Sequence, residues 1–304
     1  MDGSQNGSPP RIPGLIYISP LGEGGMSHVW KAFDTHRNET VAVKILKSEF
    51  SDDAGDIGHF RNEERAIEDI SHPGIVKGYR FGHASGVWYC VMEYVDGYDF
   101  STLLKRKGRI SQSDCLLICE SVAAALDCAW NDHGVVHCDI KPDNIMVNSR
   151  GEIKIADLGL CHVFADMADA SHKDSDHVTG TPAYISPEQI YGDVEPDCRA
   201  DIYSLGATLY HLSTGRVLFP SLGSEETLRA HCDENAAGRD PRFYNPMLSE
   251  GFCQMLEAML VKDRDCRLQS WEETLSVCAD VLNGAMFKQR QDSSPSSMKL
   301  GFTT

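Results

Sequence analysis

The sequence predicts an α+β protein in which a small strand-rich lobe precedes a larger, mainly helical lobe. Between Leu15 and Val95, short runs of apolar residues alternate with polar ones, which is the period of half-buried strands. From Ser111 onward, apolar residues recur at helical spacing over longer runs. A chain of 304 residues is long enough for two such lobes.

The clearest strand of the first lobe is Thr40–Leu46, where β-branched residues alternate with Ala42 and Lys44. One helix interrupts the strands and carries apolar residues at helical spacing. The expected strands are Leu15–Leu21, Val29–Phe33, Thr40–Leu46, Ile75–Val76 and Val87–Met92, and the expected helix is Gly58–Ile70.

A capping sequence, Ser111-Gln112-Ser113-Asp114, predicts the start of a long helix that runs to Trp130. Further helices are expected over Ala200–Thr214, Glu225–Cys232, Glu250–Leu260 and Trp271–Leu282. The two ends of the chain are polar and poor in large apolar side chains, which favours flexible tails. The expected organisation is therefore a tail over 1–14, lobes over 15–95 and 96–284, and a tail over 285–304.

The net charge of −17 argues against a nucleic-acid-binding protein, because phosphate contacts need clustered Lys and Arg. The same charge favours basic partners electrostatically. The eleven cysteines are an odd number without close pairing, and no signal-peptide pattern opens the chain, so we expect reduced thiols and a cytoplasmic protein. No apolar run approaches the length of a membrane span.

The stretch His137-Cys138-Asp139-Ile140-Lys141-Pro142-Asp143-Asn144, followed by Asp157-Leu158-Gly159, carries the strongest functional signal. It places a candidate base (Asp139), a cation (Lys141) and two metal-capable oxygens (Asn144 and Asp157) in order. Phosphoryl transfer needs these parts, because it depends on charge neutralisation and on an acceptor for the hydroxyl proton. An ordinary polar loop explains any one of these positions but not the ordered set.

Two upstream features are weaker by themselves. Gly22-Glu23-Gly24-Gly25-Met26-Ser27 lies between two expected strands, where glycines let backbone N–H groups approach a phosphate, although a glycine-rich hairpin turn is the commoner explanation. Lys44 lies within an apolar strand, so it must either extend to solvent or contact an anion. Glu63 and Glu64 are equal candidates for its partner, and their spacing does not choose between them.

From about Leu15 to Leu282 the sequence resembles the eukaryotic-type protein Ser/Thr kinases, and it is most similar to their bacterial branch. The resemblance implies a bilobal kinase fold with an antiparallel sheet and one helix in the small lobe. It implies ATP with Mg²⁺ or Mn²⁺, and transfer of the γ-phosphoryl group to Ser or Thr hydroxyls of proteins, including the chain itself.

The resemblance also assigns roles. It makes Asp139 the base, with Lys141 and Thr181 beside the reaction, and Asn144 and Asp157 the metal-holding residues. Gly180–Tyr184 would seat the acceptor hydroxyl, Glu188 would pair with Arg267, and Asp201 would brace the catalytic loop. Glu63 rather than Glu64 becomes the partner of Lys44. The nucleotide-binding residues would be Leu21, Gly22, Gly24, Ser27, Val29, Ala42, Lys44, Glu63, Met92, Glu93, Val95 and Met146.

Three residues depart from the family pattern. Ser27 replaces a glycine, Leu158 replaces Phe beside Asp157, and Cys138 replaces the usual Arg before Asp139. The Cys138 replacement removes a cation that would hold a phosphorylated activation loop, and it makes the chain a non-RD type.

Two other functions compete with kinase activity. A pseudokinase or nucleotide-binding scaffold is expected to lack the lysine, the base or a metal ligand, and here all are present. A small-molecule phosphotransferase would lack the segment over 180–188.

Overall fold

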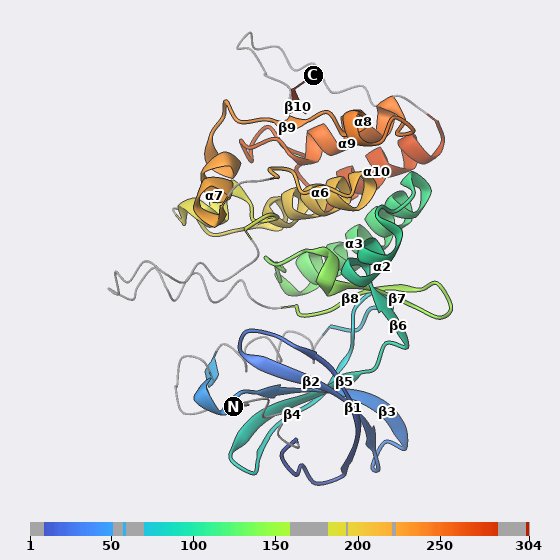
Figure 1. Ribbon diagram of the computed structural model, residues 1–304, viewed down its shortest axis with the longest axis vertical. Helices are drawn as coiled ribbons and strands as arrows, with labels where there is room; N and C mark the ends of the chain where they lie inside the picture. The colour runs from blue at the N-terminus through green and yellow to red at the C-terminus, as the bar shows by residue number, and fades with distance from the viewer. Residues whose placement is uncertain are drawn as a thin grey trace, which may run out of the picture. The chain divides into compact units, whose positions relative to one another are not determined.

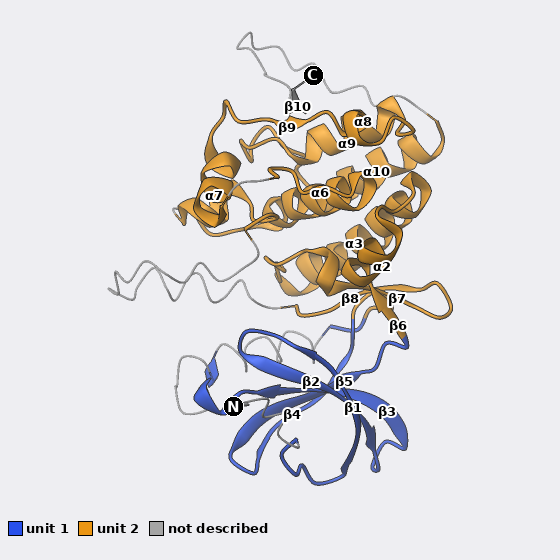
Figure 2. Ribbon diagram, in the orientation of Figure 1, with its two compact units in different colours: residues 1–71, 76–96 blue, residues 72–75, 97–304 orange. Residues whose placement is uncertain are grey.

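The protein is described by a computed structural model that covers residues 9–50, 57–58, 70–158, 182–192, 194–220, 223–284 and 302–303. The chain divides into two compact units (Figure 2). The first contains residues 1–71 and 76–96, and the second contains residues 72–75 and 97–304.

The first unit is built on a five-stranded antiparallel sheet (Figure 1). Its strand order β1-β2-β3-β5-β4 places β1 and β4 at the edges. Val41, Val43 and Ile45 point to one face of β3 and form a core with Ile12 and Val91. Strand alternation therefore sends Ala42 and Lys44 to the other face. The strands are β1 (Leu15–Glu23), β2 (Ser27–Asp34), β3 (Glu39–Leu46), β4 (Gly78–Ala84) and β5 (Val87–Glu93). A short 3₁₀ turn, η1 (Ser48–Phe50), comes shortly after β3.

The predicted strand at Ile75–Val76 is wrong. Ile75 forms only an isolated bridge to Ile155. The sheet instead contains strand β4, which the sequence did not predict. β4 is an edge strand in which only Gly78 is buried, so its sequence lacks the apolar alternation that marks β3. Most of the predicted helix over 58–70 lies outside the described residues.

The second unit is mainly helical and also contains two small sheets. In the antiparallel sheet β6-β7-β8, strand β6 precedes the loop that carries Asp139 in the sequence, and β7 and β8 follow that loop. Strand β9 pairs in parallel with β10. The helices are α2 (Phe100–Lys107), α3 (Gln112–His133), α5 (Pro187–Tyr191), α6 (Cys198–Thr214), α7 (Ser224–Cys232), α8 (Pro241–Tyr244), α9 (Glu250–Met259) and α10 (Trp271–Leu282). The strands are β6 (Gly97–Asp99), β7 (Ile145–Asn148), β8 (Ile153–Ile155), β9 (Gly238–Arg239) and β10 (Phe302–Thr303), with a 3₁₀ turn, η2, at Pro142–Asn144.

Helix α6 forms the centre of this unit and contacts α3, α9 and α10 (Figure 1). Nearly all of its side chains are buried, as expected for a helix that other elements surround. The predicted start of α3 is confirmed, because the Ser111 hydroxyl accepts a hydrogen bond from the Asp114 backbone N–H at 3.1 Å. No helix in the described part of the chain combines the length and apolar character that crossing a bilayer requires.

Candidate functional site

The loop around Asp139 has an unusual backbone conformation. Cys138 has a φ of 63° and Asp157 has a φ of 59°, both in the left-handed region that residues other than glycine rarely adopt. Such conformations persist only where the surrounding structure imposes them, and they gather at functional sites. Specific hydrogen bonds impose the first of them.

The carboxylate of Asp201, on α6, holds the loop through two consecutive backbone amides. Its Oδ2 accepts from the N–H of His137 and its Oδ1 accepts from the N–H of Cys138, each at 2.7 Å. Burial raises the pKa of Asp201 to about 6, although the two N–H groups and His137 oppose this rise. The predicted bracing role of Asp201 therefore has a direct geometric basis.

Two further side chains hold the carbonyls on either side of Asp139. The Gln189 amide, on α5, donates to the Cys138 carbonyl at 2.9 Å, and the Thr208 hydroxyl, on α6, donates to the Ile140 carbonyl at 3.2 Å. Neither residue was anticipated from the sequence, because a polar residue within a helical pattern carries no signal of its partner. With these bonds, the backbone on both sides of Asp139 is fixed by α5 and α6.

Asp139 itself lies within a compact cluster. The Lys141 Nζ donates to its Oδ2 at 2.6 Å, and the Asn144 Nδ2 donates to the same oxygen at 3.1 Å and to the Asp139 carbonyl at 2.9 Å. The side chains of Asp139 and Lys141 are 13% and 19% exposed, so solvent reaches the pair. A carboxylate held in this way has its orientation fixed by its neighbours.

Asn144 and Asp157 fit a divalent cation by their chemistry. The Asn144 amide nitrogen faces the oxygens of Asp139, so its amide oxygen is the atom left for a cation. The Ala156 N–H donates to the Asn144 carbonyl at 2.8 Å, which ties the residue before Asp157 to Asn144. Oxygen ligands in small number suit Mg²⁺, which keeps waters and substrate phosphates as its other ligands.

In the first unit, the register of the sheet gathers four predicted nucleotide-binding residues. Val29 pairs with Lys44 on the neighbouring strand, and Ala42 pairs with Met92. Because paired residues of antiparallel strands point to the same face, these four side chains share one face of the sheet. It is the face opposite the Val41–Val43 core.

The turn between β1 and β2 is closed by a hydrogen bond from the Gly24 N–H to the Ser27 carbonyl at 2.8 Å. A Cβ added at Gly22 or Gly25 would meet nothing within 4 Å, and neither residue has a positive φ. Packing within the described residues therefore does not require glycine at either position, and the space beside both residues is open.

The remaining predicted residues are placed as follows. Leu21 is 45% exposed on β1, and Val95 is buried just after β5. The Glu93 N–H donates to the Lys77 carbonyl at 2.9 Å. Met146 lies on β7, paired with Asp99 and Lys154. Glu63 and Thr181 lie outside the described residues.

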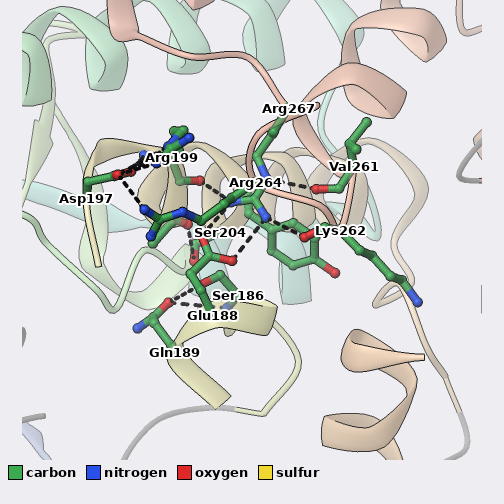
Figure 3. A network of polar contacts seen from close by, with 12 residues as sticks. Ser186, Glu188, Gln189, Asp197, Arg199, Ser204, Val261, Lys262, Arg264 and Arg267 are labelled. Atoms are coloured by element: carbon green, nitrogen blue, oxygen red, sulfur yellow. Dashed lines mark hydrogen bonds and ion pairs between the residues drawn. The ribbon is translucent and has the colours of Figure 1, made fainter. Parts of the chain in front are cut away.

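The predicted pair of Glu188 and Arg267 is present and almost fully buried (Figure 3). Two parallel contacts of 2.7 and 3.1 Å join the guanidinium to the carboxylate. Arg267 also donates to the carbonyls of Val261, Lys262 and Arg199. All the N–H groups of its guanidinium are therefore hydrogen-bonded. The pair joins α5 to the segment before α10.

The cysteines differ in part from the expectation. Nine of those described are thiols, in agreement with it, but Cys138 is disulfide-bonded, so the expectation of uniformly reduced thiols is wrong at that position. The remaining cysteine of the eleven, Cys161, lies outside the described residues. The spacing of the cysteines gives no signal for this bond, because a disulfide depends on proximity in the fold.

Comparisons with known proteins agree with this geometry. The protein kinase domain model matches residues 16–277. The probable serine/threonine-protein kinase PknB of Bifidobacterium longum is 34% identical over 88% of this chain and 39% of its own length. The serine/threonine-protein kinase PknA of Mycobacterium tuberculosis is 36% identical over 82% of this chain and 57% of its own length.

The chain thus spans roughly two fifths to three fifths of the length of these two curated relatives. Among solved structures, the PknI kinase domain of Mycobacterium tuberculosis superposes with a TM-score of 0.68 at 24% identity, and the match covers 89% of this chain and 97% of that one. This likeness confirms the predicted fold, with a five-stranded antiparallel sheet in one lobe and helices in the other. The extent of the family match and the fold together show that the chain belongs to the protein kinase domain family.

Proposed function

We propose that this chain is an ATP-dependent protein kinase that transfers the γ-phosphoryl group to Ser or Thr hydroxyls of proteins. The observation that carries the proposal is the cluster of Asp139, Lys141 and Asn144, held by hydrogen bonds of 2.6 to 3.1 Å. Its relatives PknB and PknA are named serine/threonine-protein kinases, which supports the same acceptor class.

In the proposed reaction, Asp139 accepts the proton of the attacking hydroxyl, and its carboxylate points the hydroxyl toward the phosphate. Lys141, 2.6 Å from that carboxylate, supplies positive charge next to the transferred group. Asn144 and Asp157 would hold Mg²⁺ or Mn²⁺, which neutralises phosphate charge when bound. Lys44 would contact the nucleotide phosphates, and the Gly22–Ser27 turn would cover them.

The acceptor is expected to be a basic protein segment, because a net charge of −17 attracts cations over a long range. The chain also carries its own Ser and Thr residues, so we include autophosphorylation in the proposal. We assign Thr181 to the seat of the acceptor hydroxyl, next to the described residues that begin at Pro182.

The test is incubation of the purified protein with labelled ATP, Mg²⁺ and a synthetic peptide that has one serine between lysines. Phosphoserine on the peptide is the expected product, and an Asp139→Asn variant should lose at least about 10²-fold in rate. A parent protein that binds ATP but transfers no phosphate would favour the nucleotide-binding scaffold instead. Phosphotyrosine as the main product would contradict the acceptor class.

We also propose that activity does not require phosphorylation of the segment after Asp157, since Cys138 replaces the arginine that would hold such a phosphate. The candidate acceptors Ser171, Ser175 and Thr179 lie outside the described residues. A triple alanine variant at these positions should keep peptide phosphorylation within a few-fold of the parent. A drop of about 10-fold or more, equivalent to about 1.4 kcal/mol of barrier, would refute this control scheme.

A further inference from the structure

The contact between Tyr184 and His211 joins the segment that we assign to the acceptor seat to helix α6. The Tyr184 hydroxyl lies 2.7 Å from Nδ1 of His211. The two rings are also stacked, with centroids 6.0 Å apart and planes inclined by 28°. Tyr184 is buried and His211 is half-buried, so the contact fixes the tyrosine side chain against α6. A second Tyr–His contact, from the Tyr203 hydroxyl to Nδ1 of the fully buried His231 at 2.7 Å, instead joins α6 to α7.

Both partners of the Tyr184–His211 contact are neutral at pH 7. Burial raises the pKa of the Tyr184 hydroxyl, which therefore keeps its proton. Burial lowers the pKa of His211, and the Asp143 carboxylate opposes this shift. A neutral imidazole has one N–H and one acceptor nitrogen, so Nδ1 either accepts from the Tyr184 hydroxyl or donates to it. In both cases the distance of 2.7 Å is that of a well-formed hydrogen bond.

The same face of α6 also holds the loop that carries the base. Thr208 follows Asp201 by seven residues and precedes His211 by three, a spacing that places the three side chains on one face of a helix. Asp201 and Thr208 bind the backbone on the two sides of Asp139, as described above. His211 continues this series and binds Tyr184. One helix therefore sets the position of both the base loop and the acceptor segment.

Helix α5 provides a second link between the acceptor segment and the base loop. The Gln189 Oε1 accepts from the Ser186 N–H at 3.2 Å and from its hydroxyl at 2.8 Å, and the Gln189 amide donates to the Cys138 carbonyl. The segment is thus held at Ser186 by α5 and at Tyr184 by α6. Of the two points, Tyr184 is closer in sequence to Thr181, which we assign to the acceptor seat.

We propose that His211 is a positioning residue that fixes the acceptor segment relative to Asp139 through its hydrogen bond to the Tyr184 hydroxyl. The inference rests on the proposed kinase function, because it concerns the acceptor seat of that reaction. A displaced acceptor slows transfer steeply, so loss of the hydrogen bond should lower kcat for a protein or peptide acceptor. Transfer to water does not use the segment, so ATP hydrolysis without peptide should not depend on His211.

The test measures both reactions on the full chain, with the single-serine peptide flanked by lysines. His211→Phe keeps an aromatic ring beside Tyr184 and removes Nδ1. We expect its kcat for the peptide to fall about 10-fold, while ATP hydrolysis without peptide stays within about two-fold of the parent. His211→Asn should recover most of the loss, because its Oδ1 stands as many bonds from the backbone as Nδ1 and accepts from the same hydroxyl.

Two further variants test whether the effect passes through Tyr184. Tyr184→Phe should also lower kcat for the peptide about 10-fold, and the double variant Tyr184→Phe/His211→Phe should be about as slow as either single variant, because all three lack the same hydrogen bond. Tyr210→Phe is the matched control. Its hydroxyl also extends from α6 but donates to the Arg239 carbonyl at 2.8 Å, so its loss should leave kcat within about two-fold of the parent.

A kcat for the peptide within two-fold of the parent in His211→Phe would overturn the inference. So would a parallel loss of ATP hydrolysis and peptide phosphorylation, because that pattern indicates only a structural role. Single effects that multiply to about 10²-fold in the double variant would also overturn it, since the two residues would then act separately. A parent that hydrolyses ATP but phosphorylates no peptide would instead refute the proposed function, and the inference would fall with it.

Discussion

The ammonium nitrogen of Lys141 lies 2.6 Å from Oδ2 of Asp139, and the Asn144 amide binds the same oxygen. One carboxylate oxygen is thus held by two donors from the residues that follow it in the chain. The other oxygen has no hydrogen bond of this kind to Lys141 or Asn144. In the proposed reaction, the second oxygen is therefore the one left to accept the proton of the acceptor hydroxyl.

Replacing Lys141 with Met should lower kcat by about 10²-fold, because it removes a preorganised positive charge beside the base. The KM for ATP should change little. The matched control is Lys105→Met on α2, which removes an exposed lysine and should leave the rate unchanged. Steady-state peptide phosphorylation measures both, and a Lys141→Met variant with a rate within a few-fold of the parent would contradict the assignment.

Replacing Glu188 with Gln should reduce the free energy of unfolding by about 3 kcal/mol, because it leaves the buried Arg267 charge without its counter-ion. Glu225→Gln breaks an ion pair with Arg229 whose side chains are 75% and 74% exposed, and should cost less than about 1 kcal/mol. Urea denaturation followed by circular dichroism compares the two. Equal losses in the two variants would show that burial does not decide the strength of the Glu188 pair.

Acid should weaken the fold through His231. Its folded pKa of about 4 lies below the usual 6.5, so the unfolded chain takes up a proton first as the pH falls. The contribution of neutral His231 to the free energy of unfolding is therefore complete above pH 6.5. It is lost progressively as the pH falls to 4, by about 3 kcal/mol in total. Lys262, the titratable cation that faces the ring, has a pKa lowered to about 8 and stays charged throughout this window. The Tyr203 hydroxyl stays protonated, because burial raises its pKa.

The measurement is the difference in unfolding free energy between the parent and His231→Gln at several pH values. Other groups titrate in both proteins, so the difference isolates His231. We expect the advantage of the parent to be constant above pH 6.5 and to shrink as the pH falls below it. A difference that does not change with pH would contradict the lowered pKa of His231.

Digestion without reductant should yield a peptide in which Cys138 is disulfide-bonded, and reductant should release it. Cys138→Ser should keep activity within about three-fold of the reduced parent, since Asp201 and Gln189 hold residue 138 through backbone atoms that every side chain shares. Mass spectrometry of alkylated digests is the measurement. Alkylation of Cys138 in the absence of reductant would show that the bond is not formed.

The sequence predicted the elements whose pattern is local. β3 alternates strictly, and α3 has a serine cap, so both were placed within a few residues. Strand β4 was missed because an edge strand that is only half buried does not need apolar alternation. The small sheet β6-β7-β8 was missed because its strands are very short and because β6 pairs with β7 from a distant part of the chain.

The candidate site divides in the same way. Asp139, Lys141 and Asn144 lie close in sequence, and their order alone predicted the cluster that the structure shows. Gln189 and Thr208 reach the loop from residues far along the chain, so no local pattern could reveal them. The buried contact between His231 and the Tyr203 hydroxyl gave no signal either, because it joins two helices that lie apart in the sequence.

The double hydrogen bond of Asp201 has a consequence for the order in which the chain matures during synthesis. The ribosome makes residues 137 and 138 well before residue 201, so the loop emerges before the carboxylate that fixes it. A nascent chain that ends before α6 contains Asp139, Lys141 and Asn144 but lacks the contacts that impose their geometry. The loop therefore acquires the geometry described above only after α6 has emerged and packed against it.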